Sequence, residues 1–312
     1  MTAVATWADG VFLLGTDVRH ELAGRSVRGL ALDHEGALLA IVDGTTLRRR
    51  DPRGEWRTLA TSTASLSACV ALPDGLLVGT DDARVLRLDP TRDDAALEPI
   101  RSFDEVEGRE SWYAGTAIVD GRVVGPPLGV RSMSATCDGA AILVNVHVGG
   151  IVRSTDGGRS WHPTIDIEAD VHEVRAHPER AEIVAAAAAV GLCVSTDGGA
   201  SWSTEAEGLH AAHCLAVGLT GDEVLVSAGV DPFTPEGAVY RRALSAPGPL
   251  SPVGGGLPRW LEGPPDTACI ATREDRIALV DKGGHVHVSP DRGASWSSLD
   301  VRVPGASGVV LA

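Results

Sequence analysis

The chain has 312 residues, of which 44% are hydrophobic, and carries a formal net charge of −15 from 27 basic and 42 acidic residues. This composition is sufficient for a large buried core, and the strong negative charge disfavours binding to nucleic-acid phosphates. The N-terminal residues lack the basic start and apolar segment of a secretory signal, and the longest apolar stretch, 182–193, is too short to span a bilayer. We expect a cytoplasmic protein with no nucleic-acid or membrane partner.

The predicted strands recur along the chain at a regular spacing. The N-terminus opens with two strand-like segments, Ala3–Trp7 and Val11–Leu14, that have no partner before them. Seven later segments share apolar or small residues in phase, and each of the first six precedes a turn and a second apolar strand. The segments are Val27–Leu32, Leu66–Ala71, Val130–Ala135, Val171–Ala176, Ala211–Ala216, Asp266–Ala271 and Ala306–Leu311. The last leaves no room for three more strands. We therefore expect it to join the N-terminal strands, which would remove two open sheet edges.

An eight-residue motif marks the phase of these repeats. It occurs at 154–161 as Ser-Thr-Asp-Gly-Gly-Arg-Ser-Trp, returns 41 residues later at 195–202, and returns again at 289–296. A decayed version ends at Trp56. The aspartate can accept hydrogen bonds from the backbone of its own turn, the glycines allow unusual dihedral angles, and the tryptophan buries a large ring. The motif therefore indicates a structural turn.

A repeat of about forty residues that forms four strands is typical of a β-propeller, because each unit needs its neighbours to bury its faces. We predict an all-β fold, a single seven-bladed propeller of four-stranded antiparallel blades closed by the C-terminal strand. The expected blades are approximately 1–25 with 305–312, 26–64, 65–103, 130–168, 170–209, 210–257 and 265–303, with an insertion at 104–129.

The eight-residue motif resembles the Asp box, or BNR repeat, of sialidase-like propellers. Two further stretches, 144–151 and 170–178, resemble an uncharacterised bacterial cytosolic branch of BNR/YVTN-like propellers. The resemblance implies the fold and says little about activity, because the same box occurs in proteins with unrelated functions. A sialidase would need an arginine triad, an Arg-Ile-Pro segment and a tyrosine nucleophile with its glutamate. The chain has no Arg-Ile-Pro and only two tyrosines, so it is not a true sialidase.

The long connections of the predicted propeller all fall on one face. We define the top face as the side on which the first strand of each blade begins. Three long connections lie there, 104–129, 231–237 and 257–265, and they carry Trp112, Tyr113, Phe233 and Trp260. Elaborated loops on a rigid scaffold are where binding sites usually form. We expect these aromatic side chains, together with Arg28, Arg131 and Asp266 at strand starts, to bind a ligand.

Histidines gather on the same face. His147, His172 and His210 are predicted on neighbouring blades at the channel mouth, with Glu173 beside them. Three imidazoles and a carboxylate suit a divalent transition metal, and equally suit general acid and base work. The alternative is that these residues form hydrogen-bonded pairs without a functional role. Arg131 can bind a carboxylate or phosphate, or it can pair with Asp170 or Glu173.

Two functions of different class remain open from the sequence. The first is a binding module that holds a small molecule or a peptide at the top mouth of the channel, with no certain cofactor. The second is an enzyme, a lyase, hydrolase or isomerase, in which His172, Glu173 and Arg131 are the candidate catalytic residues and the histidines hold a divalent metal. No nucleophile and base pair can be recognised in the sequence, which favours the binding module.

Overall fold

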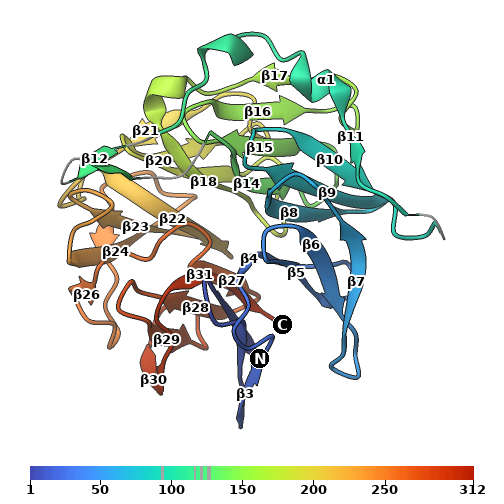
Figure 1. Cartoon of the computed structure of the whole chain (residues 1–312). Helices are drawn as coiled ribbons and strands as arrows, with labels where there is room; N and C mark the ends of the chain where they lie inside the picture. The colour runs from blue at the N-terminus through green and yellow to red at the C-terminus, as the bar shows by residue number, and fades with distance from the viewer. Residues whose placement is uncertain (93–94, 116, 120–121, 125–127) are drawn as a thin grey trace.

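Short apolar strands separated by glycine-containing turns fold into seven antiparallel sheets around a central channel (Figure 1). The computed structural model describes residues 1–312 except 93–94, 116, 120–121 and 125–127. The predicted fold class, a seven-bladed propeller of four-stranded sheets closed by the C-terminal strand, is confirmed.

The innermost strands line the channel and contact one another in a closed ring. In ring order they are β31 (Ala306–Leu311), β4 (Val27–Leu32), β8 (Leu66–Leu72), β14 (Val130–Ala135), β18 (Val171–Ala176), β22 (His213–Thr220) and β27 (Ile270–Arg273). The channel between them holds a cavity of about 1040 Å³.

The second strand of each blade is the most deeply buried, because both of its faces pack against neighbouring blades. These strands are β1 (Thr2–Thr6), β5 (Leu38–Val42), β9 (Gly75–Thr80), β15 (Ile142–Val146), β19 (Val184–Ala188), β23 (Glu223–Gly229) and β28 (Arg276–Val280). Four of them, β1, β5, β15 and β19, are buried at every residue. Such strands are continuously apolar, whereas a strand with one face in water alternates.

The third strands are β2 (Val11–Leu14), β6 (Thr46–Arg50), β10 (Val85–Leu88), β16 (Gly150–Ser154), β20 (Gly191–Ser195), β24 (Glu236–Ala243) and β29 (His285–Ser289). The outermost strands are β3 (Val18–Glu21), β7 (Trp56–Thr61), β11 (Glu98–Pro99), β17 (His162–Pro163), β21 (Ser203–Glu205), β25 (Ser251–Pro252) and β30 (Ser297–Arg302). A short strand, β26 (Leu261–Glu262), also pairs with β24.

Among the described residues, helical structure occurs only in the connections between blades. The helix α1 (Arg101–Asp104) and the 3-10 turn η1 (Arg109–Ser111) begin the predicted insertion, which continues into the hairpin β12 (Ala117–Val119) and β13 (Arg122–Val124). Part of this insertion lies outside the described residues. A second 3-10 turn, η2 (Ile167–Ala169), leads into β18. Within the described ranges, no helix has the length and apolar character needed to cross a bilayer.

The two ends of the chain meet in one sheet, and Figure 1 shows them side by side. Strand β31 pairs with β1 from Thr2 opposite Leu311 to Thr6 opposite Ala306. The terminal amino group also donates to the carbonyl of Ala312 at 2.8 Å. The first blade is thus assembled from both ends of the chain, which leaves no gap in the ring.

Two inner strands begin later than the sequence pattern predicts. Strand β22 starts at His213 rather than Ala211, and β27 starts at Ile270 rather than Asp266. At the second position the chain turns first, because the Cys269 amide bonds to the carbonyl of Asp266 and Ala268 has a φ of 62°. The residues of this turn continue the apolar pattern of a strand in the sequence, although their backbone does not have strand geometry. The sequence pattern therefore predicts too early a start.

The three Ser-x-Asp turns join the third and fourth strands of their blades, on the bottom face. In the second, Asp197 accepts the backbone N–H groups of Ala200 at 3.0 Å and Ser201 at 2.9 Å, and the Ser195 hydroxyl at 2.7 Å. Asp156 and Asp291 make the same kind of turn. The aspartate thus organises its own loop, as the motif predicts.

These turns also connect blades. The arginines Arg87, Arg153 and Arg241, each on the third strand of the preceding blade, donate to a glycine carbonyl in the next turn, at 3.4, 2.8 and 3.2 Å. A carbonyl held at a fixed place by the aspartate therefore becomes the acceptor for a charged donor across the blade interface, where such bonds are stronger than neutral ones.

Removing residues 305–312 tests the closure of the ring. The deletion exposes an edge on β1 and removes the strand that connects β27 to β4, so we expect a loss of stability larger than the roughly 2–5 kcal/mol typical of one truncated core side chain. Thermal and urea unfolding measure the change. Removing only Ala312, which leaves β31 intact, is the control. Unfolding curves that match the intact protein would show that the ring does not need this strand.

Replacing Asp197 by Asn tests the turn through its pH dependence. The hydrogen bonds from Ser201, with those from Ser195 and Ala200, lower the pKa of Asp197 to about 2. A carboxylate with a depressed native pKa stabilises the fold above its unfolded pKa, and that stability is lost as the pH falls toward 2. The intact protein should therefore lose more stability between pH 7 and pH 3 than the variant. Urea unfolding at both pH values, with Asp17→Asn in the exposed β2–β3 turn as control, makes the comparison.

Candidate functional site

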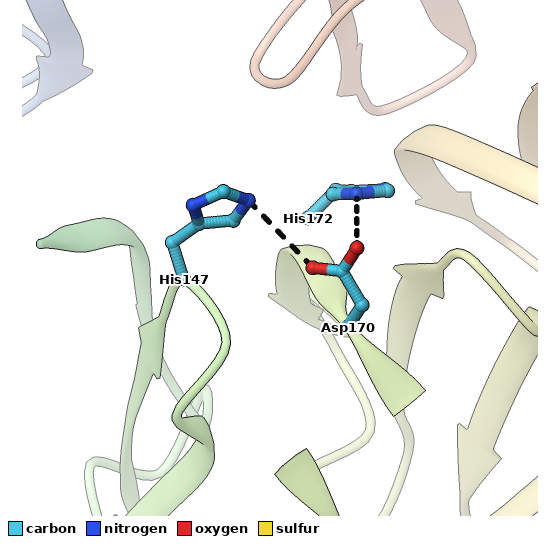
Figure 2. A group of neighbouring side chains, drawn as sticks. All are labelled: His147, Asp170 and His172. Atoms are coloured by element: carbon cyan, nitrogen blue, oxygen red, sulfur yellow. Dashed lines mark ion pairs between the residues drawn. The ribbon is translucent and has the colours of Figure 1, made fainter. Parts of the chain in front are cut away.

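Two histidines and an aspartate from adjacent blades meet at the top mouth of the channel. His147 follows β15 in blade 4, Asp170 immediately precedes β18 in blade 5, and His172 is the second residue of β18. Figure 2 shows the carboxylate lying between the two imidazoles. The Nε2 atoms of His147 and His172 are each 3.6 Å from a different oxygen of Asp170. The three potential ligand atoms all lie within 4.8 Å of one another.

Unusual backbone geometry places these side chains. Asp170 adopts the left-handed region, with φ 47° and ψ 72°, at the end of η2, and its amide donates to Ile167 at 3.0 Å. Aspartate tolerates this region better than most residues. Val148, directly after His147, also has a φ of 47°. A β-branched residue is an outlier there, and such strain is often found at functional sites.

The environment of His172 fixes which nitrogen faces the aspartate. Its Nδ1 lies 2.5 Å from the backbone carbonyl of Cys214 on β22. A carbonyl can only accept, so Nδ1 carries a proton, and Nε2 is the nitrogen that faces Asp170. A nitrogen and a carboxylate oxygen in this position attract each other only when a proton or a cation lies between them.

Several buried polar atoms around the cluster lack a hydrogen-bond partner in the described part of the chain. They are Oδ1 of Asn145, Nδ1 of His147, Oδ1 of Asp170 and Nε2 of His213. The ring of His213 lies against His172, with a centroid distance of 4.7 Å. Buried polar groups are normally paired, so a concentration of unpaired ones at one mouth indicates that they serve another ligand.

The protonation states suit a metal site. Burial, with a contribution from Arg131, lowers the pKa of His147 to about 4. Burial, with contributions from His172 and Arg131, lowers the pKa of His213 to about 4. Partial burial opposes ionisation of Asp170, yet its pKa is lowered because His172, His147 and Arg131 surround it. A neutral His147 imidazole and an ionised Asp170 carboxylate are the forms that bind a divalent cation.

Arg131 and Arg28 line the same channel as His147 but differ in their partners. Arg28 donates from both terminal nitrogens to Asp81, with the shorter bond at 2.8 Å, and from Nη2 to the Ser65 hydroxyl at 2.8 Å. Arg131 donates from Nε to the Thr267 hydroxyl at 2.9 Å, while its Nη2 lies 3.5 Å from Asp266. The terminal nitrogens of Arg131 are therefore the more available for a ligand.

Glu173 does not face the histidine cluster in the way the sequence suggests. It is fully buried, accepts Nε of Arg175 at 2.6 Å, and accepts the backbone N–H of Val217 on β22 at 3.1 Å. Burial raises the pKa of Glu173. Its contacts connect blades 5 and 6, which is the arrangement of a structural brace.

His210 belongs to a different cluster. Its Nδ1 lies 2.8 Å from the hydroxyl of the buried Tyr240, and its ring packs edge-on against Trp260 at 5.0 Å between centroids. Arg259 donates to the same hydroxyl at 2.9 Å and stacks over Trp260. The expected trio of His147, His172 and His210 is thus not assembled, and Asp170 lies where the third histidine was expected.

The four loop aromatics are divided between surface and core. Tyr113, Phe233 and Trp260 are 50%, 60% and 46% exposed. Trp112 is only 8% exposed and packs against Phe103 and Arg109, so it lies in the core and does not present its ring to a ligand as expected. The Trp112 ring packs into an apolar cluster between blades 3 and 4, because removing its large apolar surface from water lowers the free energy of the folded state.

The insertion nevertheless reaches the site. The Tyr113 amide donates to Val148 at 3.3 Å, and a Cβ placed on Gly115 would lie 2.2 Å from Cε1 of His147. Only glycine fits so close to the imidazole. Trp7, after β1, is a further aromatic that lines the channel and that sequence reasoning did not assign to the site.

Asp170 and His213 are the cluster residues whose importance the sequence reasoning missed. Asp170 was considered only as a partner for Arg131. One signal was present: Asp170 and His172 are two residues apart at a strand start, a spacing that directs both side chains to the same side. His213 gave no comparable signal apart from its place at the start of an inner strand.

Comparisons with known proteins support the fold. No family model matches the chain, and no curated protein matches it. A GH74 enzyme from Niastella koreensis superposes with a TM-score of 0.62 at 13% identity, covering 96% of this chain and 47% of that one. The GH74 xyloglucanase of Xanthomonas campestris gives 0.60 at 17% identity, over 96% and 46%. The Pan2 WD40 domain of Neurospora crassa gives 0.57 at 11% identity, over 90% and 80%.

The chain therefore spans about half the length of the GH74 chains it resembles. At these identities the similarity shows the fold alone. The protein is a β-propeller whose structural neighbours include enzymes and a WD40 domain, and its function has to be argued from its own site.

Replacing Glu173 by Ala tests whether this residue stabilises the contact between blades 5 and 6. The change leaves the Val217 amide unpaired in the interior, so we expect the free energy of unfolding to fall by about 1–3 kcal/mol. Glu173→Gln, which keeps an acceptor for that amide, should lose less. Urea denaturation measures both variants. Equal stability of Glu173→Ala and the unmodified protein would contradict the bracing role.

Proposed function

We propose that this chain binds a divalent transition-metal ion through His147, Asp170 and His172, and that the ion holds a small-molecule ligand at the top mouth of the channel. The observation that carries the proposal is the position of the Asp170 carboxylate, 3.6 Å from Nε2 of each imidazole (Figure 2).

These separations fit a coordinated ion better than a hydrogen-bonded trio. A nitrogen and an oxygen 3.6 Å apart are beyond normal hydrogen-bond distance. In a tetrahedral site with metal–ligand bonds of about 2.1 Å, neighbouring ligand atoms lie about 3.4 Å apart. A small adjustment of the side chains would therefore be enough to accommodate an ion. Oδ1 of Asp170, which has no partner among the described residues, would gain one, and Nε2 of His172 would face a cation.

The number of ligands favours a site that recruits another molecule. Structural zinc sites are usually closed by four protein ligands, whereas sites with three protein ligands keep a position open for water or substrate. Two imidazoles and one carboxylate also suit iron(II) and other first-row ions. The open position would adjoin the channel cavity, which His147 lines.

A second candidate function is an enzyme, a lyase, hydrolase or isomerase, at the same site. The observation in its favour is His213, whose buried Nε2 is unpaired and whose ring lies 4.7 Å from that of His172. A neutral imidazole beside an open metal position is suited to general base work. When bound, the metal would supply Lewis acidity there.

We also infer that the chain belongs with the Asp-box propellers. The support is the three turns in which an aspartate organises the loop between the third and fourth strands, each in the same phase of its blade.

Titration of metal-free protein with zinc, followed by calorimetry and metal analysis, tests the proposal. Because His147 and His172 each supply one of three protein ligands, His147→Ala and His172→Ala should each weaken zinc binding by about 100-fold or more. The matched control is His162→Ala, an exposed histidine on the outer strand β17, which should bind zinc as the unmodified protein does. All variants are first checked for the β-sheet circular dichroism spectrum. Unchanged zinc affinity in folded His147→Ala and His172→Ala would refute the site.

A further inference from the structure

We infer that the ligand held at this site carries an oxyanion, a carboxylate or phosphate group, bound jointly by the metal ion and by Arg131. This inference rests on the proposed metal site and adds the chemical class of its ligand.

The first support is the position of Arg131. Two consecutive hydrogen bonds connect its guanidinium to the backbone of His172, one of the three proposed metal ligands. Nε donates to the Thr267 hydroxyl at 2.9 Å, and that hydroxyl donates to the carbonyl of His172 at 3.3 Å. Arg131 and His147 also line the same channel cavity. The guanidinium is therefore anchored beside His172 through one nitrogen.

The second support is that the terminal nitrogens of Arg131 are under-used. Its side chain is 18% exposed, and the closest acid, Asp266, lies 3.5 Å from Nη2, at the outer limit of hydrogen bonding. Asp266 is shared, because Nζ of Lys282 lies 3.9 Å from its other oxygen. An arginine held by Nε, with its outer edge turned to a cavity and only weakly paired, presents the planar donor pair that carboxylates and phosphates prefer.

The third support is the local charge. The chain as a whole carries −15, yet at this mouth Arg131 and Lys282 both lie beside Asp266, and Arg131 also interacts electrostatically with Asp170, so these two positive and two negative charges cancel. A divalent ion would make the mouth positive. Inside an otherwise acidic protein, a positive mouth with low-dielectric walls attracts small anions and disfavours cationic ligands.

The cavity behind the mouth sets the size of this ligand. Its volume of about 1040 Å³ is at the upper end of the range of small-molecule sites. Small inner-strand residues, such as Ala68, Ser132 and Gly218, form part of its wall. The oxyanion would be held at the mouth, and the remainder of the molecule would extend into the channel.

The experiment measures anion binding to zinc-loaded protein that has been freed of excess ion. Malonate and inorganic phosphate are titrated separately by calorimetry into the unmodified protein and into Arg131→Gln. We expect at least one probe to bind, and Arg131→Gln to weaken that binding about 10-fold or more while zinc affinity changes by less than about 3-fold. The probe that binds more tightly identifies the carboxylate or phosphate class.

The control variant is Arg273→Gln. Arg273 lines the same cavity at its bottom end and donates to the carbonyl of Leu311, so this variant removes an equal charge away from the site. Anion binding should be retained. If Arg131→Gln does not fold, Arg131→Lys, which keeps the charge and loses the planar fork, takes its place, and it should also weaken anion binding.

The outcomes separate the two proposals. Failure of the unmodified protein to bind zinc overturns the metal site itself. Zinc binding without binding of either anion, or equal anion binding by the unmodified protein and the folded Arg131 variant, overturns the oxyanion inference and leaves the metal site standing. Equal weakening in Arg131→Gln and Arg273→Gln also overturns it, since the effect would then be one of general charge.

Discussion

The pairing of β1 with β31 is the constraint on which the rest of this structure depends. Each blade buries its faces only against its two neighbours, so an open ring would leave two apolar sheets in water. The ladder between Thr2–Thr6 and Ala306–Leu311 prevents this by building one blade from both ends of the chain. Closure also fixes the angle between successive blades, and thereby brings residues of blades 4, 5, 6 and 7 to one channel mouth.

Stability and candidate function occupy opposite faces of the ring. On the bottom face, the aspartate turns satisfy their own backbone groups and receive arginines from the preceding blade. In those turns the polar groups have hydrogen-bond partners within the protein. On the top face, the cluster of His147, Asp170 and His172 has unpaired buried atoms and left-handed residues beside it. A protein can accept such locally unfavourable geometry where the surrounding sheets hold the backbone firmly, and functional sites are where it is usually found.

The residues around the cluster fall into two groups according to how many of their hydrogen-bonding atoms have protein partners. One group holds blades together, and the other faces the site of a ligand. Glu173 and Arg28 were candidates for the site, yet protein partners occupy the carboxylate of Glu173 and both terminal nitrogens of Arg28. Arg131 makes its short hydrogen bond through Nε, while its Nη2 lies 3.5 Å from Asp266, and Asp170 carries a buried oxygen without a partner among the described residues. Full pairing marks a side chain that holds the fold together, whereas incomplete pairing at a cavity marks one that is available to a ligand.

The sequence by itself determined the architecture: seven blades, a bottom face of aspartate turns, and closure by residues 306–311. It could do so because strand periodicity and turn chemistry are local, and the motif repeats at a constant phase. Which side chains meet at the mouth was decided only by tertiary structure. His210 was drawn to Tyr240 and Trp112 to the core, while Asp170 was placed between two imidazoles by a left-handed turn. These positions depend on loop paths and on packing between blades, and residues distant in sequence settle both.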